Sequence, residues 1–583
     1  MTSSPSKSGR WSLRGSRTTT PAAATPDNVS EVGVQLGRAT LGDASDFGDV
    51  GDVATSTGDE LSVADELQED TDSERGKFKA LLGILRKTIS VKDLSSVRIS
   101  LPANMMEPIG NLEFWTYIDR PDYFAALADL DGADELTRML ALLRWMFTKE
   151  LKYAKHPIAK SFNSILGEHF HCYYDTPLVE LHPESGHPVP AVHLDENPAP
   201  EVVISAGRGA TGTATSAAAL KSSPSVTTVS KRRSGAVQSS SASIASTSSA
   251  ALSTSGGSTY TAASSGNSIS TKKARVVIIN EQTSHHPPIS HFLVEARVGT
   301  GPAQRTVRLR GVDQLSAKYT GANVRIVPGE HNKGLFVELA TGEEWQITHP
   351  TAAVAGLLRA SPYATICDAT TVTCTKEVSA GEGGGGSKKR LRAIVEYREE
   401  SWIARPRFAV EGVVYESFAG EADTAGSSDA GDCGDKRFAR IKHVPKERIV
   451  GTLEGNWRGE IRWKKAGETT SVPLVDLLPL AVVPKAVAPL SEQDELETRR
   501  VWAPVVDALE KKEYSTASKE KQRIEQAQRD KAVERERNGE SYVPRFFQPE
   551  PDDLAAWDGR PVLTEAGRAA IERDFQADYS EGA

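Results

Sequence analysis

Short segments in which apolar and polar residues alternate recur between residues 306 and 463 of this 583-residue chain. Each segment can form a strand with one buried face, and polar turns separate one segment from the next. The clearest segments lie at 306–309, 324–327, 335–339, 393–397, 408–415, 449–453 and 460–463. Because so many half-buried strands need partners, the pattern predicts a large antiparallel sheet or barrel.

Helical patterns flank these strands on both sides. Residues 135–147 predict an amphipathic helix with an apolar stripe made of Leu136, Met139, Leu140, Leu143 and Phe147. A long charged helix is expected to follow Ser515 and to end near Asn538 and Gly539, since glycine commonly follows the last turn of a helix. The predicted class is therefore α+β, dominated by the sheet.

Two tracts are too polar and too simple in composition to build a core. Residues 1–75 are rich in Ser, Thr, Gly, Asp and Glu, and we expect a disordered N-terminal tail there. A Ser-, Thr- and Ala-rich tract at about 205–272 predicts a disordered insertion. The folded domain that it interrupts is expected to span residues 76–580.

Composition narrows the expected partners and compartment. The formal net charge of −9 and the pI of about 5.9 argue against a nucleic acid as a partner. The four cysteines are widely spaced, which favours a reducing compartment. The N-terminus has no apolar segment, and prolines and charges interrupt the most hydrophobic window, residues 473–490. We therefore expect a soluble, cytoplasmic protein.

The segment NEQTSHHPPI, residues 280–289, follows an apolar β-branched run at 276–279. Adjacent residues of a strand point to opposite faces, and Pro287 and Pro288 are not expected to continue a paired ladder. The ladder should therefore break where His285 and His286 can turn toward one target, and two imidazoles suit a phosphate group. A plain strand-to-turn junction is one alternative. A zinc site with His291 is another, but adjacent histidines before two prolines suit zinc poorly.

Residues 281–288 also resemble the fingerprint of the oxysterol-binding-protein family of lipid-transfer proteins, here as a short form without a pleckstrin-homology domain. The resemblance implies a near-closed antiparallel β-barrel that encloses a lipid tunnel, with an N-terminal lid and helices and a C-terminal helical segment. It further implies that phosphatidylinositol 4-phosphate binds at the tunnel mouth and that no cofactor takes part. Sterol is the expected second cargo, with phosphatidylserine as the alternative.

A second segment, KSFNSILGE at 160–168, resembles the family signature Lys-Pro-x-Asn-Pro-x-Leu-Gly-Glu. Ser161 and Ser164 stand in place of the two prolines of that signature. The resemblance implies that Lys160, Asn163 and Glu168 contact the inositol-phosphate headgroup.

Lys521, Glu525 and Arg529 are spaced four residues apart, so they lie on one face of the predicted charged helix. From spacing alone, a surface ladder of ion pairs is the simplest interpretation. The family carries a Lys-x-x-x-Glu-x-x-x-Arg helix, and the resemblance implies that Lys521 and Arg529 meet the phosphates beside His285 and His286. Glu525 would accept a hydrogen bond from a ring hydroxyl.

A short basic amphipathic pattern precedes these segments and predicts a lid made of Phe78, Leu81, Leu82 and Leu85. Such a helix closes over a tunnel or contacts an anionic membrane surface, and packing in a helical core is the alternative. Leu94 and Ser95 resemble the hinge of the family's lid.

These features predict a lipid-transfer protein that works at membranes or membrane contact sites and is not an enzyme. A phosphoester-processing enzyme is one rival, although the sequence has no Gly-x-Ser-x-Gly elbow and no evident metal set. A lipid-regulated scaffold or sensor is the other. An acidic patch at 46–52 resembles a motif that docks lipid-transfer proteins on the endoplasmic reticulum, so a tether protein there is a further expected partner.

Overall fold

The computed structural model describes residues 106–155, 160–183, 186–195, 272–319, 323–356, 363–376, 389–400, 405–418, 422–423 and 436–579. The chain divides into two units, Met1–Ser62 and Val63–Ala583, and every described residue belongs to the second. The predicted tail lies outside the described residues, as does the predicted insertion apart from Lys272. The same holds for the predicted lid residues Phe78, Leu81, Leu82, Leu85, Leu94 and Ser95.

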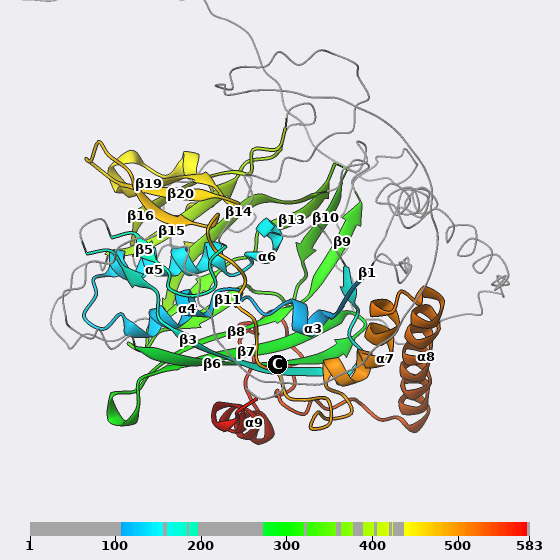
Figure 1. Ribbon diagram of the computed structural model, residues 1–583. Helices are drawn as coiled ribbons and strands as arrows, with labels where there is room; N and C mark the ends of the chain where they lie inside the picture. Colours follow the sequence, from blue (N-terminus) through cyan, green and yellow to red (C-terminus); the bar gives the residue numbers. More distant parts are fainter. Residues whose placement is uncertain are drawn as a thin grey trace, which may run out of the picture. The chain divides into compact units, whose positions relative to one another are not determined.

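One 15-stranded sheet dominates the described part of the chain (Figure 1). Its main path runs in the order β21-β20-β19-β16-β15-β14-β12-β11-β8-β7-β6-β3, and β9, β10 and β13 branch from it beside β14. The strand bounds are β3 His169–Pro177, β6 Lys273–His285, β7 Pro288–Val298, β8 Arg305–Asp313, β9 Leu315–Tyr319, β10 Val324–Pro328, β11 Leu335–Glu338, β12 Glu344–Ile347, β13 Thr351–Ala355, β14 Tyr363–Lys376, β15 Lys389–Tyr397, β16 Ala409–Phe418, β19 Ile449–Asn456, β20 Glu460–Lys465 and β21 Val472–Asp476.

All of the alternating segments predicted as strands lie in this sheet, in β8, β10, β11, β15, β16, β19 and β20. The alternation has the expected physical cause, since side chains along a strand point to opposite faces. In β8, Val307 and Leu309 are fully buried in the main apolar core. Arg308 and Arg310 alternate with these residues and point to the other face, where each approaches a carboxylate at 2.7 Å, Glu295 of the adjacent β7 and Glu344 of β12, two strands away.

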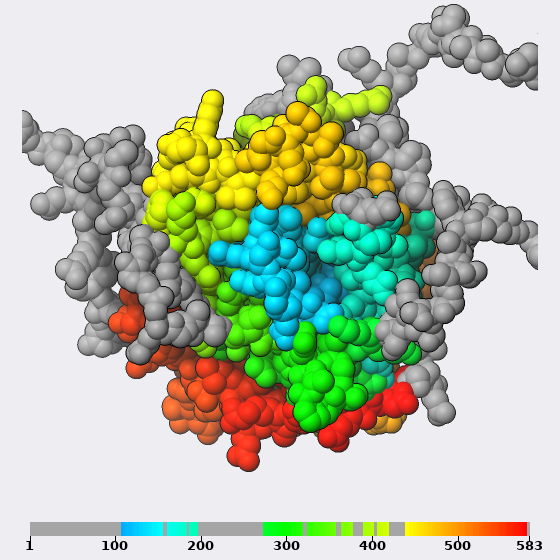
Figure 2. All heavy atoms as spheres, turned by 90° about the vertical axis from the view of Figure 1, so that its left-hand side faces the viewer, coloured from blue at the N-terminus to red at the C-terminus, as the bar shows by residue number. Residues whose placement is uncertain are grey.

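The helices before β3 pack into the main core together with the sheet. They are α3 Asn111–Phe114, α4 Pro121–Ala125, α5 Glu135–Thr148 and α6 Lys152–Lys155. The predicted helix 135–147 is confirmed as α5, and the Asp134 side chain caps its start by accepting from the Thr137 amide at 2.7 Å. Figure 2 shows this segment, in blue and cyan, between the green and the yellow-to-orange parts of the surface.

Three helices lie near the C-terminus: α7 Thr498–Glu510, α8 Tyr514–Asn538 and α9 Glu565–Gln576. The predicted charged helix is confirmed as α8, and Gly539 ends it with φ of 67°, a left-handed conformation that glycine adopts without strain. α9 and the preceding segment cover the outer face of β3, β6 and β7. This cover explains why β6 reads as a continuous apolar run rather than an alternating one.

The strand order begins at β21 and ends at β3, and the described residues include no pairing between these two edge strands. The predicted α+β class with a large, near-closed antiparallel sheet is confirmed. The lipid tunnel within it stays a prediction. Among the described helices, none combines the length and the apolar character needed to cross a bilayer.

Candidate functional site

The His-His-Pro-Pro segment forms the turn between β6 and β7. As predicted, the strand ends at the histidines, because β6 ends at His285. The expectation that Pro288 would not continue a paired ladder was wrong, because Pro288 begins β7 opposite His285. Proline is tolerated as the first residue of a strand, where its missing N–H is not needed. The irregularity falls earlier, as a register shift between Gln282 and Ser284.

The two histidines therefore sit at the tip of a hairpin. His285 is half-buried and His286 is exposed, and their ring centroids lie 4.6 Å apart with the planes at 65°. The His286-Pro287 peptide bond is cis. His291, which the zinc alternative required, lies further along β7 and places its Nε2 2.8 Å from Glu550 Oε1. That contact turns His291 toward the C-terminal segment.

The residues just before the histidines connect β6 to distant parts of the chain. Asn280 Nδ2 donates to the Leu112 carbonyl at 2.8 Å. Gln282 exchanges backbone hydrogen bonds with the segment before β3, donating to Glu168 at 2.8 Å and accepting from Gly167 at 2.9 Å. The motif thus fixes the N-terminal helices and the Lys160 segment to the strand that carries the histidines.

Glu281 makes the largest set of these connections. Its buried carboxylate accepts from the Tyr542 hydroxyl at 2.9 Å. It also accepts from the backbone amides of Arg545, Phe546 and Phe547, at 2.6, 2.8 and 3.2 Å. Hydrogen bonds to a charged acceptor are the strong ones in proteins. Glu281 therefore holds the chain that follows α8.

The Lys160 segment lies beside α8. Lys160 begins β2, Lys160–Phe162, which pairs in parallel with β1, Met106–Gly110. Its Nζ donates to Asn163 Oδ1 at 2.7 Å. Burial, together with the Lys521 ammonium, lowers the pKa of Lys160 to about 8, while Glu525 opposes the shift. The ammonium groups of Lys160 and Lys521 therefore share one neighbourhood, which includes the Glu525 carboxylate.

Helix α8 presents the predicted triad along one face. Lys521 is only 8% exposed, and its Nζ lies 2.7 Å from Glu525 Oε1. Arg529 is exposed, and its Nε donates to Gln526 Oε1 at 3.0 Å. Ala517 and Ile524 pack with Phe162 and Trp502, which seats the first half of α8 against β2 and α7.

Glu168 occupies a different environment from the one that the sequence suggested. It is fully buried, and its carboxylate accepts from the Ile165 amide at 2.9 Å, the Thr498 hydroxyl at 2.9 Å and the Trp502 indole at 3.2 Å. Burial raises the pKa of Glu168 to about 7. These contacts hold the Lys160 segment against α7, and a headgroup contact is not supported for this residue.

The structure thus joins Lys160, Asn163, Lys521 and Glu525 in one cluster, which we term the cation cluster. His285 and His286 lie on the strand whose Gln282 is bonded to the same segment, and Arg529 lies two turns beyond Lys521 on α8. Sequence reasoning missed Tyr542, which joins β6 to the chain after α8. The one hint in the sequence is that Tyr542 comes shortly after Gly539, the residue that ends the helix.

A polar cluster lies in the interior, next to the main core. The Tyr117 hydroxyl donates to Asp313 Oδ1 at 2.6 Å, and burial raises the pKa of Asp313 to about 7. Lys149 and Glu150 form an ion pair of 2.6 Å nearby. Burial lowers the pKa of His349, whose ring lies 5.6 Å from that of Tyr117, to about 4.

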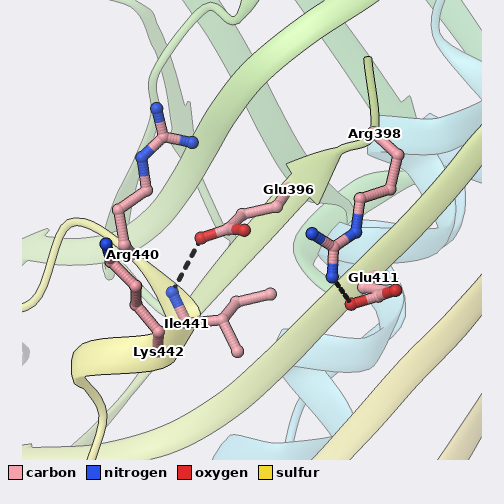
Figure 3. A pocket seen from close by; sticks show the side chains of 6 residues that line it. All are labelled: Glu396, Arg398, Glu411, Arg440, Ile441 and Lys442. Carbon is pink, nitrogen blue, oxygen red and sulfur yellow. Dashed lines mark hydrogen bonds and ion pairs between the residues drawn. The ribbon is translucent and has the colours of Figure 1, made fainter. Parts of the chain in front are cut away.

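A charged surface pocket of about 440 Å³ lies at the sheet, over β15 and β16 (Figure 3). Arg398 and Glu411 form an ion pair across it, and Glu396 accepts from the Ile441 amide at 2.8 Å. Arg440 lies 3.7 Å from Asp368. Here each arginine approaches a carboxylate of its own.

Comparison with known proteins agrees with the motifs. The family model described as "Oxysterol-binding protein" matches residues 80–199, 257–426 and 503–563. Oxysterol-binding protein-like protein 1 of Schizosaccharomyces pombe is 39% identical over 520 residues, which cover 87% of this chain and 93% of the relative. Human oxysterol-binding protein-related protein 11 is 32% identical over 20% of this chain and 15% of its own length.

Two solved structures were also similar to this chain. One is the ORD of Osh3 from Saccharomyces cerevisiae in complex with PI(4)P, at a TM-score of 0.47 and 14% identity, covering 86% of this chain and 94% of that one. The other is the Osh1 ORD domain in complex with cholesterol, at a TM-score of 0.45 and 15% identity, covering 88% and 99%.

Proposed function

We propose a function from one premise: this chain belongs to the oxysterol-binding protein family. The protein binds lipids in its β-rich domain and transfers them between membranes. Phosphatidylinositol 4-phosphate docks its headgroup on the cation cluster and the two histidines, with Arg529 completing the site. The acyl chains occupy a tunnel in the sheet, and a second lipid competes for the same tunnel.

The observation that carries this proposal is the cation cluster. Lys160 and Lys521 come from segments more than 300 residues apart, yet the Lys521 ammonium helps to lower the pKa of Lys160. Two partly buried ammonium groups lie close together here, and a phosphate monoester beside them would favour the charged form of both. Asn163 and Glu525 supply hydrogen-bond acceptors for ring hydroxyls. No covalent step is needed.

For the second cargo we favour a sterol. A sterol has one hydroxyl to satisfy and an otherwise apolar body. A polar cluster in the interior offers hydrogen-bond partners for such a hydroxyl; it consists of Tyr117, Asp313, Lys149 and Glu150. Acyl chains have no polar group that could pair with these side chains. Phosphatidylserine is the alternative cargo. Mass spectrometry of lipids that co-purify with the protein separates the two.

The test of the function is transfer between liposomes. Donor liposomes carry phosphatidylinositol 4-phosphate and acceptor liposomes carry sterol, each with a fluorescent reporter. We expect the protein to move both lipids in opposite directions, with sterol transfer slower when the phosphoinositide is left out. Binding of both lipids without transfer would favour a lipid-regulated sensor, and loss of the phosphate from the lipid would favour a phosphoester enzyme.

We further propose that the protein works as a peripheral protein at anionic membrane surfaces of the cytoplasm, including contact sites where a tether on the endoplasmic reticulum can hold it. Excess cationic charge near the lipid site would be attracted to such surfaces. Sedimentation with liposomes of graded phosphatidylserine content, at low and high salt, tests this proposal.

A further inference from the structure

Tyr542 is the point where the three segments of the proposed lipid site meet. Its hydroxyl donates to Glu281 on β6, four residues before His285. Its hydroxyl oxygen also lies against Gly167, because a Cβ built on Gly167 would stand 3.1 Å from it. Gly167 lies near the end of the Lys160 segment, residues 160–168, and Tyr542 itself follows α8.

The two halves of α8 are held in different ways. The first half is packed, since Ala517 and Ile524 belong to an apolar cluster with Phe162 and Trp502 and the last buried residue of the helix is Gln528. The second half is almost entirely exposed. Arg529 stands at the beginning of that exposed half. Core packing therefore holds α8 as far as Gln528, directly before Arg529, and the exposed turns that follow lead to the end that Tyr542 contacts.

The other end is tethered by Tyr542. From Arg529 to Asn538 the helix rises ~14 Å, at 1.5 Å per residue. From Glu281 to His285 the strand extends ~13 Å, at 3.3 Å per residue. The two lengths are similar, so where α8 runs back along β6 a tether between Tyr542 and Glu281 brings Arg529 to the level of the histidines.

We propose that Tyr542 and Glu281 are positioning residues that hold Arg529 in register with His285 and His286 for recognition of a lipid phosphate. Neither residue touches the headgroup. The inference rests on the proposed function and assigns a further pair of residues to it. The physical reason is that a long exposed helix end samples many orientations unless a strong hydrogen bond at its exit restricts them.

The test compares two substitutions of the same kind. Tyr542→Phe removes the hydroxyl at the proposed tether. Tyr173→Phe is the matched control, because the Tyr173 hydroxyl accepts from the Tyr579 amide at 2.8 Å and so also joins the C-terminal segment to the sheet. Tyr173 lies on β3 opposite Val277, well before the histidines along β6.

We expect Tyr542→Phe to lower the affinity for phosphatidylinositol 4-phosphate in liposomes about three- to tenfold. Uptake of sterol should stay within about twofold of the native protein, since the tether acts on the headgroup site alone. Tyr173→Phe should leave both unchanged. An equal loss of both lipids in Tyr542→Phe, or no loss of the phosphoinositide, overturns the inference.

A double-substitution cycle gives a second and independent readout. If Tyr542 acts through Arg529, Tyr542→Phe should have no further effect on phosphoinositide affinity in protein that already carries Arg529→Ala. Additive losses would show that Tyr542 acts otherwise. A native protein that binds no phosphatidylinositol 4-phosphate contradicts the proposed function itself, whereas normal binding by Tyr542→Phe contradicts only this inference.

Discussion

Two of the places where cations gather in the described part of the chain can be compared, and of the two only the cation cluster has the electrostatics of an anion site. In the cation cluster, burial and the neighbouring Lys521 lower the pKa of Lys160 to about 8. In the surface pocket of Figure 3, hydrogen bonding to Glu411 raises the pKa of Arg398. The charged form of Lys160 is therefore disfavoured by its surroundings, whereas the charged form of Arg398 is already stabilised by Glu411.

The difference teaches how to tell a binding site from a balanced surface. An exposed arginine with its own carboxylate gains little from a further anion and remains well hydrated. A partly buried lysine beside another lysine would gain from any phosphate that neutralises both. The number of cations in a patch is therefore a poorer guide than the direction in which their pKa values move.

The largest expected effect is the loss of headgroup binding when the cation cluster is removed. Lys160→Ala combined with Lys521→Ala should weaken binding of phosphatidylinositol 4-phosphate about 100-fold, because two charge-assisted hydrogen bonds are lost. Arg398→Ala combined with Arg440→Ala removes the same charge from the surface pocket and should leave binding unchanged. Liposome flotation at one salt concentration measures both, and equal losses in the two variants would break the comparison.

Glu168 gives the next largest effect, on stability. Glu168→Ala leaves the buried Ile165 amide and Trp502 indole without their acceptor, which should lower the free energy of unfolding by about 3 kcal/mol. Urea unfolding followed by tryptophan fluorescence measures the loss. A variant with native stability and abolished phosphoinositide binding would instead restore Glu168 as a headgroup ligand.

The smallest effect is a pH dependence that belongs to Lys160. Its lowered pKa of about 8 means that the free protein loses this charge as the pH rises through that value. A bound phosphate raises the pKa, so binding takes up a proton there and affinity should fall up to tenfold per pH unit above pH 8. In Lys160→Arg the side chain keeps its charge, so the affinity should change little between pH 8 and 9.5. An unaltered slope would mean that a group other than Lys160 titrates in this range.

Sequence patterns predicted the sheet and the helices α5 and α8 because those features depend on local periodicity. The alternation around Val307 and Leu309 and the glycine that ends α8 are both visible within a few residues. The turn at the histidines was predicted correctly, but the pairing of Pro288 was not, since only the structure shows that Pro288 starts a strand opposite His285. A pattern within a few residues of the sequence does not reveal such pairing between strands.

The site was predictable only in part for the same reason. Spacing alone placed Lys521, Glu525 and Arg529 on one helical face, and the family resemblance supplied their purpose. Burial of Glu168 depends on Thr498 and Trp502, more than 300 residues away along the chain. The Tyr542–Glu281 contact spans 261 residues and has no local pattern at all.

The central claim is that three distant segments form one site for a lipid phosphate, and the histidine pair tests it most directly. Extraction of phosphatidylinositol 4-phosphate from liposomes should be measured for the native protein and for His285→Ala combined with His286→Ala. We expect the variant to lose extraction while its thermal unfolding stays close to native, because both side chains sit at the tip of a hairpin. Full extraction by a folded variant would contradict the account.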